Sequence, residues 1–237
     1  LYPCPHTNAI SVGVYPSKNV IARSSSERRS NLAHHDNERL PRPAKAGLAM
    51  TKGTKKILLT VGRLVERKGH DQVIKAFPQV LEKFPDATYL IASSGDYEEE
   101  LKNLVAKLNL KNKVVFAGRV SDEELPDYYK SADIFIMTAR QIDQDVEGFG
   151  MVYLEAAGFA LPVIAGRSGG VAEAVLDKQT GLLVDPKNSQ EIAQAIIKLL
   201  TDEDLANKLG RAGKARVEQI FNWPTQIEKL KNLLSSD

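Results

Sequence analysis

The 237-residue chain lacks several features that define common protein classes. Its single cysteine, Cys4, excludes an internal disulfide framework, and no Cys/His cluster has the spacing of metal ligands. No apolar run approaches the roughly 20 residues of a membrane-spanning helix, and no charged start followed by an apolar stretch indicates a signal peptide. We therefore expect a cytoplasmic protein without a bound metal, the alternative being a peripheral protein at the inner face of the membrane.

The common phosphate-binding and nucleophile signatures are also missing. No G-x-G-x-x-G follows a candidate strand, and no G-x-x-x-x-G-K-[ST] occurs anywhere, which disfavours a dinucleotide dehydrogenase and a P-loop NTPase. With four histidines, the chain offers no candidate Ser-His-Asp arrangement. The net charge is only +2, and we expect no nucleic-acid partner.

Charge is unevenly distributed along the chain. Residues 1–55 hold nine Lys or Arg and three Asp or Glu, a net charge of +6, whereas the other residues hold 23 and 27, a net charge of −4. The polar stretches RSSSERRS and RLPRPAKAG show no periodicity, and residues 22–54 are predicted to form a linker or irregular arm, with VGVYPSKNVIAR as a candidate strand. We interpret the basic residues as solvated, the alternative being contact with an acidic partner or anionic lipid. The first residue, Leu1, suggests a fragment or a processed product.

From Lys56 onward the pattern becomes regular. Short apolar runs, typical of strands buried on both faces, occur at residues 57–62, 88–93, 114–118, 134–139, 162–166 and 181–185. Amphipathic stretches of helical length separate them, at residues 70–84, 97–110, 121–133, 150–160 and 169–176. This alternation predicts an α/β, Rossmann-like, doubly wound parallel sheet, in which ligands bind outside the carboxyl ends of the strands.

Two helix starts carry capping signals. Ser121 with Glu124 fits a capping box, and Asn188 fits an N-cap with Glu191 three positions on. The tail is predicted to form further helices, with a break at Trp223-Pro224.

The loop after the first predicted strand, GRLVERKG, carries two cations five residues apart. Arg63 and Lys68 are flanked by Gly62 and Gly69, which let a backbone come close to a ligand. This arrangement suits an anionic group such as a diphosphate. By itself the signal is weak, because Arg and Lys in a surface loop are usually solvated.

A second loop, DVEGFGMVYLEAAGFALPVIAG, places two glutamates around a glycine-rich turn. If a helix begins near Gly150, the N–H groups of Phe149, Gly150 and Met151 point at the solvent before it and can receive a phosphate. Glu147 can then bind a sugar and Glu155 a ribose, which together match a nucleotide diphospho-sugar. The alternative is that Glu147 is a surface residue and Glu155 lies on the polar face of an amphipathic helix.

Taken together, these pieces resemble a known family. From Lys56 to about Phe221 the chain resembles the C-terminal, donor-binding domain of a retaining glycosyltransferase of family 4, one half of a GT-B fold. The resemblance rests on VGRLVERKGHDQVIKAF, VVFAGRVSDEELPDYYKSADIFIMTA, EGFGMVYLEAAGFALPVIAG, and SGGVAEAV followed by TGLLVDP. Two glutamates separated by seven residues are a hallmark of that family. The stretch TARQIDQDVEGFG looks most like the phosphatidylinositol mannoside mannosyltransferases, which favours GDP-mannose over a UDP-sugar.

The resemblance implies roles for individual residues. Arg63 and Lys68 would hold the donor diphosphate and stabilise charge on the leaving nucleotide, Glu147 would bind the transferred sugar, and Glu155 the ribose. The residues completing the donor site would be Gly62, Phe149, Gly150 and Met151 around the phosphates and Arg119 and Val120 against the base.

Further expectations concern the neighbouring residues and the reaction. Ser168, Gly169 and Gly170 are interpreted as a packing element or turn, the alternative being ligand contact, and His70 as a helix-start residue instead of a base. Enzymes of this family retain the anomeric configuration of the sugar and require no cofactor. Their reaction is often described as front-face attack by the acceptor, with the leaving phosphate helping to take the acceptor proton.

The chain departs from the family at its beginning. A complete GT-B enzyme has an N-terminal domain carrying most of the acceptor site, but only 55 residues precede the donor domain here. We predict an irregular arm at 1–55, a nucleotide-sugar-binding domain at 56–221 and a C-terminal helix at 222–237. Transfer to a lipid, saccharide or small-molecule acceptor would need the missing acceptor domain or a partner subunit. The alternatives are a nucleotide-sugar-binding module without transferase activity and another GT-B enzyme, such as an epimerase or a phosphorylase.

Overall fold

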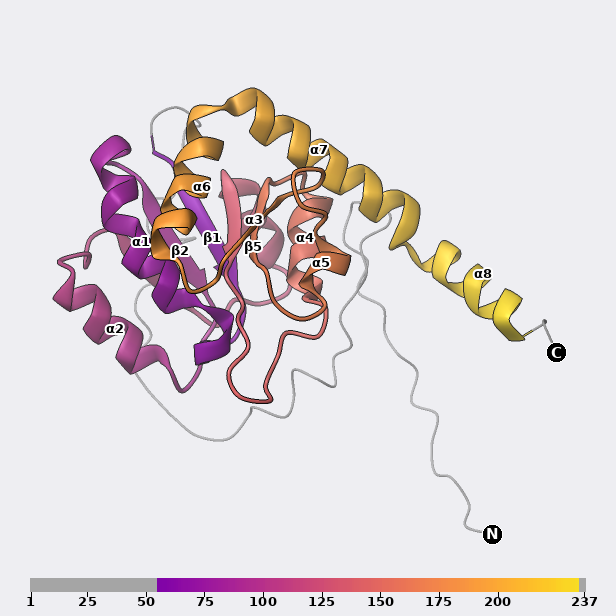
Figure 1. Cartoon of the computed structure of the whole chain (residues 1–237), viewed down its shortest axis with the longest axis horizontal. Helices are drawn as coiled ribbons and strands as arrows, with labels where there is room; N and C mark the ends of the chain where they lie inside the picture. Colours follow the sequence, from indigo (N-terminus) through magenta and orange to yellow (C-terminus); the bar gives the residue numbers. More distant parts are fainter. Residues whose placement is uncertain (1–54, 235–237) are drawn as a thin grey trace, which may run out of the picture. The chain divides into compact units, whose positions relative to one another are not determined.

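The computed structural model of the chain describes residues 55–234 (Figure 1). The arm predicted for residues 1–55, with its candidate strand, lies outside the described residues except for Lys55. Among the described residues, those up to Val217 form one compact unit and those from Glu218 belong to a second.

The first unit is built around a six-stranded parallel sheet. Its strands are β1 (Ile57–Val61), β2 (Thr88–Ala92), β3 (Val114–Gly118), β4 (Ile134–Met137), β5 (Val163–Gly166) and β6 (Leu182–Val184). Their order in the sheet is β3-β2-β1-β4-β5-β6, with Leu58 of β1 in register with Tyr89 of β2 on one side and Ile134 of β4 on the other. The order reverses between β1 and β4, and the predicted doubly wound α/β sheet is confirmed.

Helices follow the strands as the alternation predicts. They are η1, a 3₁₀ turn (Glu66–Lys68), α1 (His70–Lys83), α2 (Glu98–Lys107), α3 (Leu125–Ser131), α4 (Met151–Gly158), α5 (Val171–Ala174), α6 (Ser189–Thr201), α7 (Glu203–Ile220) and α8 (Trp223–Leu234). Asn188 caps α6 as predicted, its side chain accepting the N–H groups of Gln190 and Glu191. The predicted break before α8 is also present, and Asn222 Oδ1 accepts the N–H of Thr225 at 2.9 Å.

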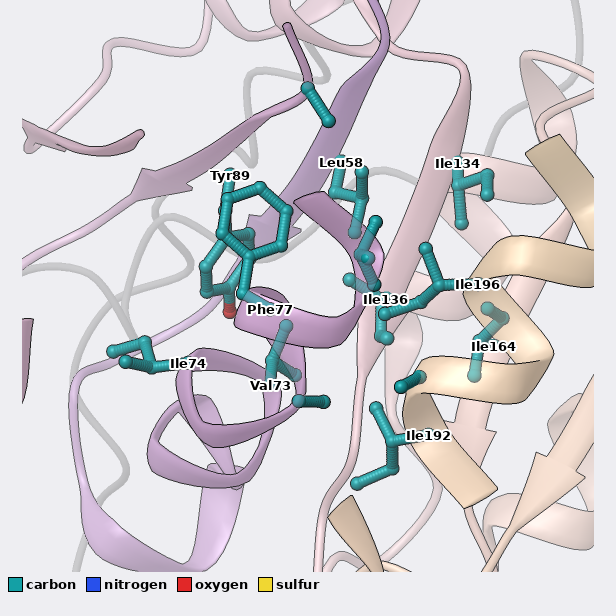
Figure 2. Close-up of a cluster of buried hydrophobic side chains, with 14 of the residues drawn as sticks. Leu58, Val73, Ile74, Phe77, Tyr89, Ile134, Ile136, Ile164, Ile192 and Ile196 are labelled. Atoms are coloured by element: carbon teal, nitrogen blue, oxygen red, sulfur yellow. The ribbon is translucent and has the colours of Figure 1, made fainter. Parts of the chain in front are cut away.

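Strand side chains alternate between two apolar layers. On one face Ile134 and Ile136 of β4 join a core formed with α1 and α6 (Figure 2). On the other face Phe135 packs 5.9 Å, centroid to centroid, from Tyr153 of α4 and 6.1 Å from Tyr129 of α3. This period-two alternation buries both faces of the central strands and fixes which helices cover each face.

Two sequence expectations need correction. β3 was expected to be buried on both faces, but among the described strands it lies at the edge of the sheet, paired with β2 alone, and its residues after Val114 are half-buried. The contacts between Ser121 and Glu124 form as a capping box predicts, yet α3 begins only at Leu125. Pro126, which lacks an N–H, occupies its first turn, where a missing donor costs little.

Candidate functional site

The candidate site lies where two loops meet at the carboxyl ends of β1 and β4. The loop after β1 contains η1, and the loop after β4 leads to Glu147 and the start of α4. Lys68 Nζ lies 2.5 Å from Glu147 Oε2, and Arg67 Nη1 lies 2.6 Å from the same oxygen. The structure therefore joins the two loops that sequence analysis singled out separately, at the point where the strand order reverses.

The carboxylate of Glu147 is buried and ionised. The residue is 7% exposed, so the alternative of a solvated surface residue is wrong. Burial alone would raise the pKa of Glu147, but the charges and hydrogen bonds of Lys68 and Arg67 outweigh burial and hold that pKa below its ordinary value. At neutral pH this carboxylate accepts hydrogen bonds and has no proton to donate. Its Oε1 receives no hydrogen bond from the residues that the structure describes.

Arg67 is a residue of this site that sequence analysis missed. Besides binding Glu147, its Nε lies 2.9 Å from Asp145 Oδ2, although this nitrogen makes no hydrogen bond. Asp145 is largely exposed, so that ion pair adds little stability. The available signal was its position in ERKG, one residue before Lys68.

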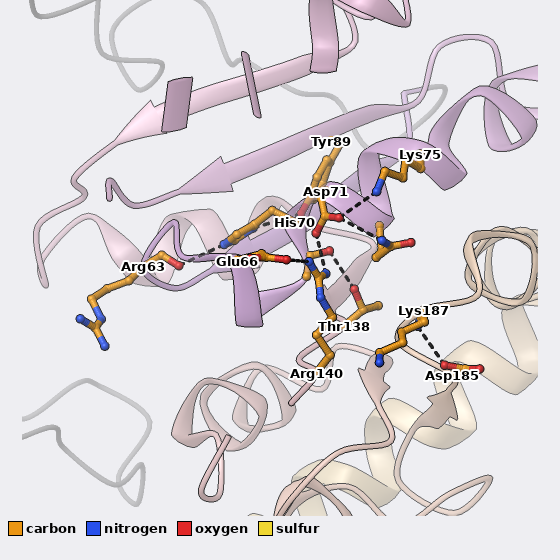
Figure 3. A network of polar contacts seen from close by, with 12 residues as sticks. Arg63, Glu66, His70, Asp71, Lys75, Tyr89, Thr138, Arg140, Asp185 and Lys187 are labelled. Carbon is orange, nitrogen blue, oxygen red and sulfur yellow. Dashed lines mark hydrogen bonds and ion pairs between the residues drawn. The ribbon is translucent and has the colours of Figure 1, made fainter. Parts of the chain in front are cut away.

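Arg63, the other predicted cation of this loop, does not contact Glu147. Its side chain is exposed and makes no hydrogen bond or ion pair within the described part of the chain. Figure 3 shows it pointing away from the polar network around Asp71 and Arg140. The structure therefore brings Lys68, but not Arg63, to Glu147.

His70 begins α1 as predicted and is 1% exposed. Its Nε2 lies 3.2 Å from the carbonyl oxygen of Arg63, and since a carbonyl only accepts, this nitrogen carries the proton. Burial lowers the pKa of His70 to about 4 against the opposing hydrogen bond to Arg63, and the nearby charge of Lys68 lowers it further. His70 is therefore neutral at pH 7 and holds the backbone at Arg63.

The helix start predicted near Gly150 is confirmed. Gly150 is the N-cap of α4 with φ of 82°, and a Cβ there would overlap the ring of Tyr153. At the first turn of α4, the N–H groups of Met151 and Val152 have no carbonyl of a preceding helical turn to bind, whereas that of Tyr153 donates to the carbonyl of Gly150 at 3.0 Å. Gly170 packs against the carbonyl oxygen of Gly148 so closely that no side chain fits, as expected for a packing element.

Glu155 is 8% exposed within α4, which is buried from Val152 to Gly158. The alternative of a polar, solvent-facing position is therefore wrong. Tyr129 donates its hydroxyl to Glu155 Oε2 at 2.9 Å, and the Tyr129 ring stacks on Phe159 with 5.2 Å between centroids. Tyr129 is a second neighbour that sequence analysis missed, since it lies 26 residues away.

The remaining predicted site residues follow the carboxyl ends of β1 and β3. Gly62 directly follows β1, and a side chain there would contact the methylene groups of Lys68. Arg119 and Val120 follow the edge strand β3, the first exposed and the second half-buried. Their predicted roles in donor binding stay predictions.

Comparison with known proteins identifies the family of this chain. Residues 49–216 match the family described as "Glycosyl transferases group 1". The chain belongs to the group 1 glycosyl transferases. The resemblance seen in the sequence motifs is thereby confirmed.

Relatives of the group 1 domain include a protein named as a mannosyltransferase. The GDP-mannose-dependent alpha-(1-6)-phosphatidylinositol monomannoside mannosyltransferase of Mycolicibacterium smegmatis is 39% identical over 185 residues, covering 77% of this chain and 48% of that protein. The chain spans about half the length of the first curated relatives it matches.

Solved structures share the fold of the group 1 domain. The C-terminal domain of a group 1 family protein, LpcC, from Francisella tularensis matches with a TM-score of 0.64 and 29% identity, covering 71% of this chain and 87% of that one. HepE from Anabaena, in complex with UDP and glucose, matches with a TM-score of 0.69 and 28% identity, covering 78% of this chain and 49% of that one. None of the described helices is long and apolar enough to cross a membrane.

Proposed function

We propose that this chain is the donor-binding half of a retaining glycosyltransferase. It binds a nucleotide diphospho-sugar, with GDP-mannose favoured over a UDP-sugar, for transfer of the hexose to a lipid, saccharide or small-molecule acceptor. The observation that carries the proposal is the meeting of Lys68 and Arg67 with the ionised Glu147 beside the start of α4. Cations and a helix N-terminus suit a diphosphate, and a carboxylate suits sugar hydroxyls.

The diphosphate is assigned to Lys68, Arg63 and the first N–H groups of α4. The ammonium of Lys68 has three donors, so it can contact a phosphate oxygen and keep its bond to Glu147. The exposed guanidinium of Arg63 is available for the phosphate from the solvent side. When the bond between the anomeric carbon and the phosphate oxygen breaks, these groups stabilise the charge that develops on the leaving nucleotide.

The sugar is assigned to Glu147. Its Oε2 is held by two cations, which leaves Oε1 to accept sugar hydroxyl groups. In the proposed retaining reaction the acceptor oxygen bonds to the face that the phosphate leaves, and the acceptor proton passes to the leaving phosphate. Glu147 then orients the sugar and is not a nucleophile.

The choice of donor rests on the relatives. The Mycolicibacterium smegmatis protein carries GDP-mannose in its name, whereas HepE was solved with UDP. The higher sequence identity to the former, 39% against 28%, favours GDP-mannose.

Glu147→Gln should separate the sugar from the nucleotide. We expect about tenfold weaker binding of GDP-mannose, because a neutral amide accepts hydroxyl groups less strongly than a carboxylate. Binding of GDP should stay unchanged or tighten, because Lys68 and Arg67 lose a competing anion. Calorimetric titration of both ligands measures the two effects. Asp145→Asn is the matched control, and an equal loss for both ligands in Glu147→Gln would remove Glu147 from the sugar.

Tyr129→Phe should weaken recognition of the ribose through Glu155. The substitution keeps the ring stacked on Phe159 and removes only the hydroxyl that orients the carboxylate. We expect the preference for GDP over 2′,3′-dideoxy-GDP to fall about three- to tenfold, the range of an ordinary net hydrogen bond, because the hydroxyl acts on the ribose only through Glu155. Tyr128→Phe, next to it in α3, is the control, and an unchanged preference would argue against a ribose at Glu155.

Transfer itself is tested by supplying an acceptor half. Joined or mixed with the N-terminal half of a mannosyltransferase relative, the chain should transfer labelled mannose from GDP-mannose. Donor binding without transfer by a folded complex would instead indicate a nucleotide-sugar-binding module.

A further inference from the structure

A buried ion pair lies beside the candidate site. Arg140, three residues beyond the end of β4, places its Nη1 2.6 Å from Oδ1 of Asp71, the second residue of α1. The two side chains are 6% and 5% exposed. Figure 3 shows the pair at the centre of a polar network that also includes Glu66 and Lys75.

The pair is charged on both sides. Burial would raise the pKa of Asp71, but the hydrogen bonds and charges of Arg140 and Lys75 outweigh it and lower that pKa. The second oxygen of Asp71 accepts Lys75 Nζ at 3.0 Å and Gln72 Nε2 at 2.9 Å. Arg140 Nη2 also reaches Glu66 Oε1 at 3.1 Å. Every charge in the network therefore has a partner, as a buried ion pair requires.

The contacts of this pair surround the turn that carries the two cations of the site. Glu66 begins η1, and Asp71 lies just after it. Between them, the backbone N–H of Arg140 donates to the carbonyl of Arg67 at 2.7 Å. Thr138 Oγ1 donates to the carbonyl of Gly69 at 2.9 Å. The segment directly after β4 is thus bonded to the turn at its start, middle and end.

The turn has little stability of its own. Its internal bonds run from the N–H of Lys68 to Val65 and from the N–H of Gly69 to Glu66, both at 3.1 Å. A single 3₁₀ turn has poor hydrogen-bond geometry and too few bonds to offset the entropy of ordering its residues. The direction in which its side chains point must therefore be set by outside contacts.

We propose that Arg140 is a positioning residue that, through Asp71 and Glu66, fixes the turn so that Lys68 faces the diphosphate of the nucleotide donor. Because Nη1 of Arg140 is bonded to Asp71 and Nη2 to Glu66, we assign its side chain to the turn and not to the ligand. A well-packed apolar pair could stabilise the core equally well, but it could not hold Glu66 and Asp71 in one geometry. The proposal rests on the proposed function, because it assigns the diphosphate to Lys68.

Two readouts on the full chain test this role, one of which needs no ligand. Arg140→Gln keeps the backbone N–H that binds Arg67 and removes the charged side chain. Hydrogen exchange at the amides of Lys68 and Gly69 should become about tenfold faster, relative to the strands of the sheet, as the turn opens locally. The preference for GDP over guanosine should fall about tenfold, because a misplaced cation loses the diphosphate while the nucleoside still binds.

Two further variants guard against a folding defect. Asp71→Asn keeps the shape of the pair and should change both readouts in the same direction by less. Leu101→Ala, at a fully buried core position in α2, should lower stability without changing exchange at the turn or the preference for GDP over guanosine.

Each outcome decides between the two proposals. Faster exchange confined to the turn, together with a lower preference for GDP, supports the positioning role. If exchange at the turn is unchanged in Arg140→Gln, whether or not GDP is bound, the positioning role is overturned. It is also overturned if the turn exchanges faster but the preference for GDP over guanosine is unchanged. If the parent chain binds GDP no better than guanosine, the proposed function fails, and the diphosphate role of Arg140 fails with it.

Discussion

Lys68→Ala should lower the affinity for GDP by about 10- to 100-fold, the range expected when a hydrogen bond between charged groups is lost. The affinity for guanosine should change by less than about twofold, because the nucleoside has no phosphate for Lys68 to bind. Titration of both ligands against the parent and the variant gives the two ratios. Arg63→Ala should act in the same direction.

The fold should survive the Lys68 substitution. Glu147 keeps Arg67 as a partner at 2.6 Å when Lys68 is removed, so no buried charge is left alone. Lys102→Ala, which removes an exposed lysine paired with Glu98 in α2, is the matched control and should change neither affinity. Equal losses for GDP and guanosine in Lys68→Ala would indicate a folding defect and contradict the diphosphate assignment.

The second large effect concerns stability and pH. Because the pKa of His70 falls from an ordinary 6.5 to about 4 in the folded chain, the unfolded chain binds a proton in this interval that the folded chain does not. The contribution of the neutral His70 to the free energy of unfolding is therefore complete above pH 6.5. About 3 kcal/mol of it is lost as the pH drops from 6.5 to 4.

Replacement of the histidine isolates this effect. In His70→Gln the loss between pH 6.5 and about 4.5 should disappear, while a loss at lower pH should remain because the pKa values of Asp71 and Glu147 are also lowered. Urea unfolding at a series of pH values measures both curves. A parent stability that stays flat down to pH 4.5 would mean that His70 is protonated in the folded chain.

The strands and most helices could be predicted because their signals are local. Each strand is a short apolar run, and the start of α6 carries its own cap at Asn188. The edge position of β3 could not be predicted, because the order of strands depends on contacts between distant segments and a half-buried edge strand has the same apolar run as a central one.

The candidate site was predicted in outline and not in its internal contacts. Sequence analysis selected Lys68 and Glu147, but Arg63 and Arg67 share one loop, and only the direction of η1 decides that Arg67 meets Glu147. The pair of Arg140 and Asp71 joins residues 69 positions apart, and neither has a distinctive sequence neighbourhood. Such contacts follow from the meeting of the β1 and β4 loops, which no local pattern encodes.

The central claim is that this chain binds a nucleoside diphosphate at the carboxyl ends of β1 and β4. Calorimetric titration of the folded chain with GDP, UDP and ADP tests it most directly, with circular dichroism to confirm the fold. We predict binding at one site, tightest for GDP and weakened in Lys68→Ala. A folded chain that binds none of the three, or a Lys68→Ala variant that binds as well as the parent, would contradict the claim.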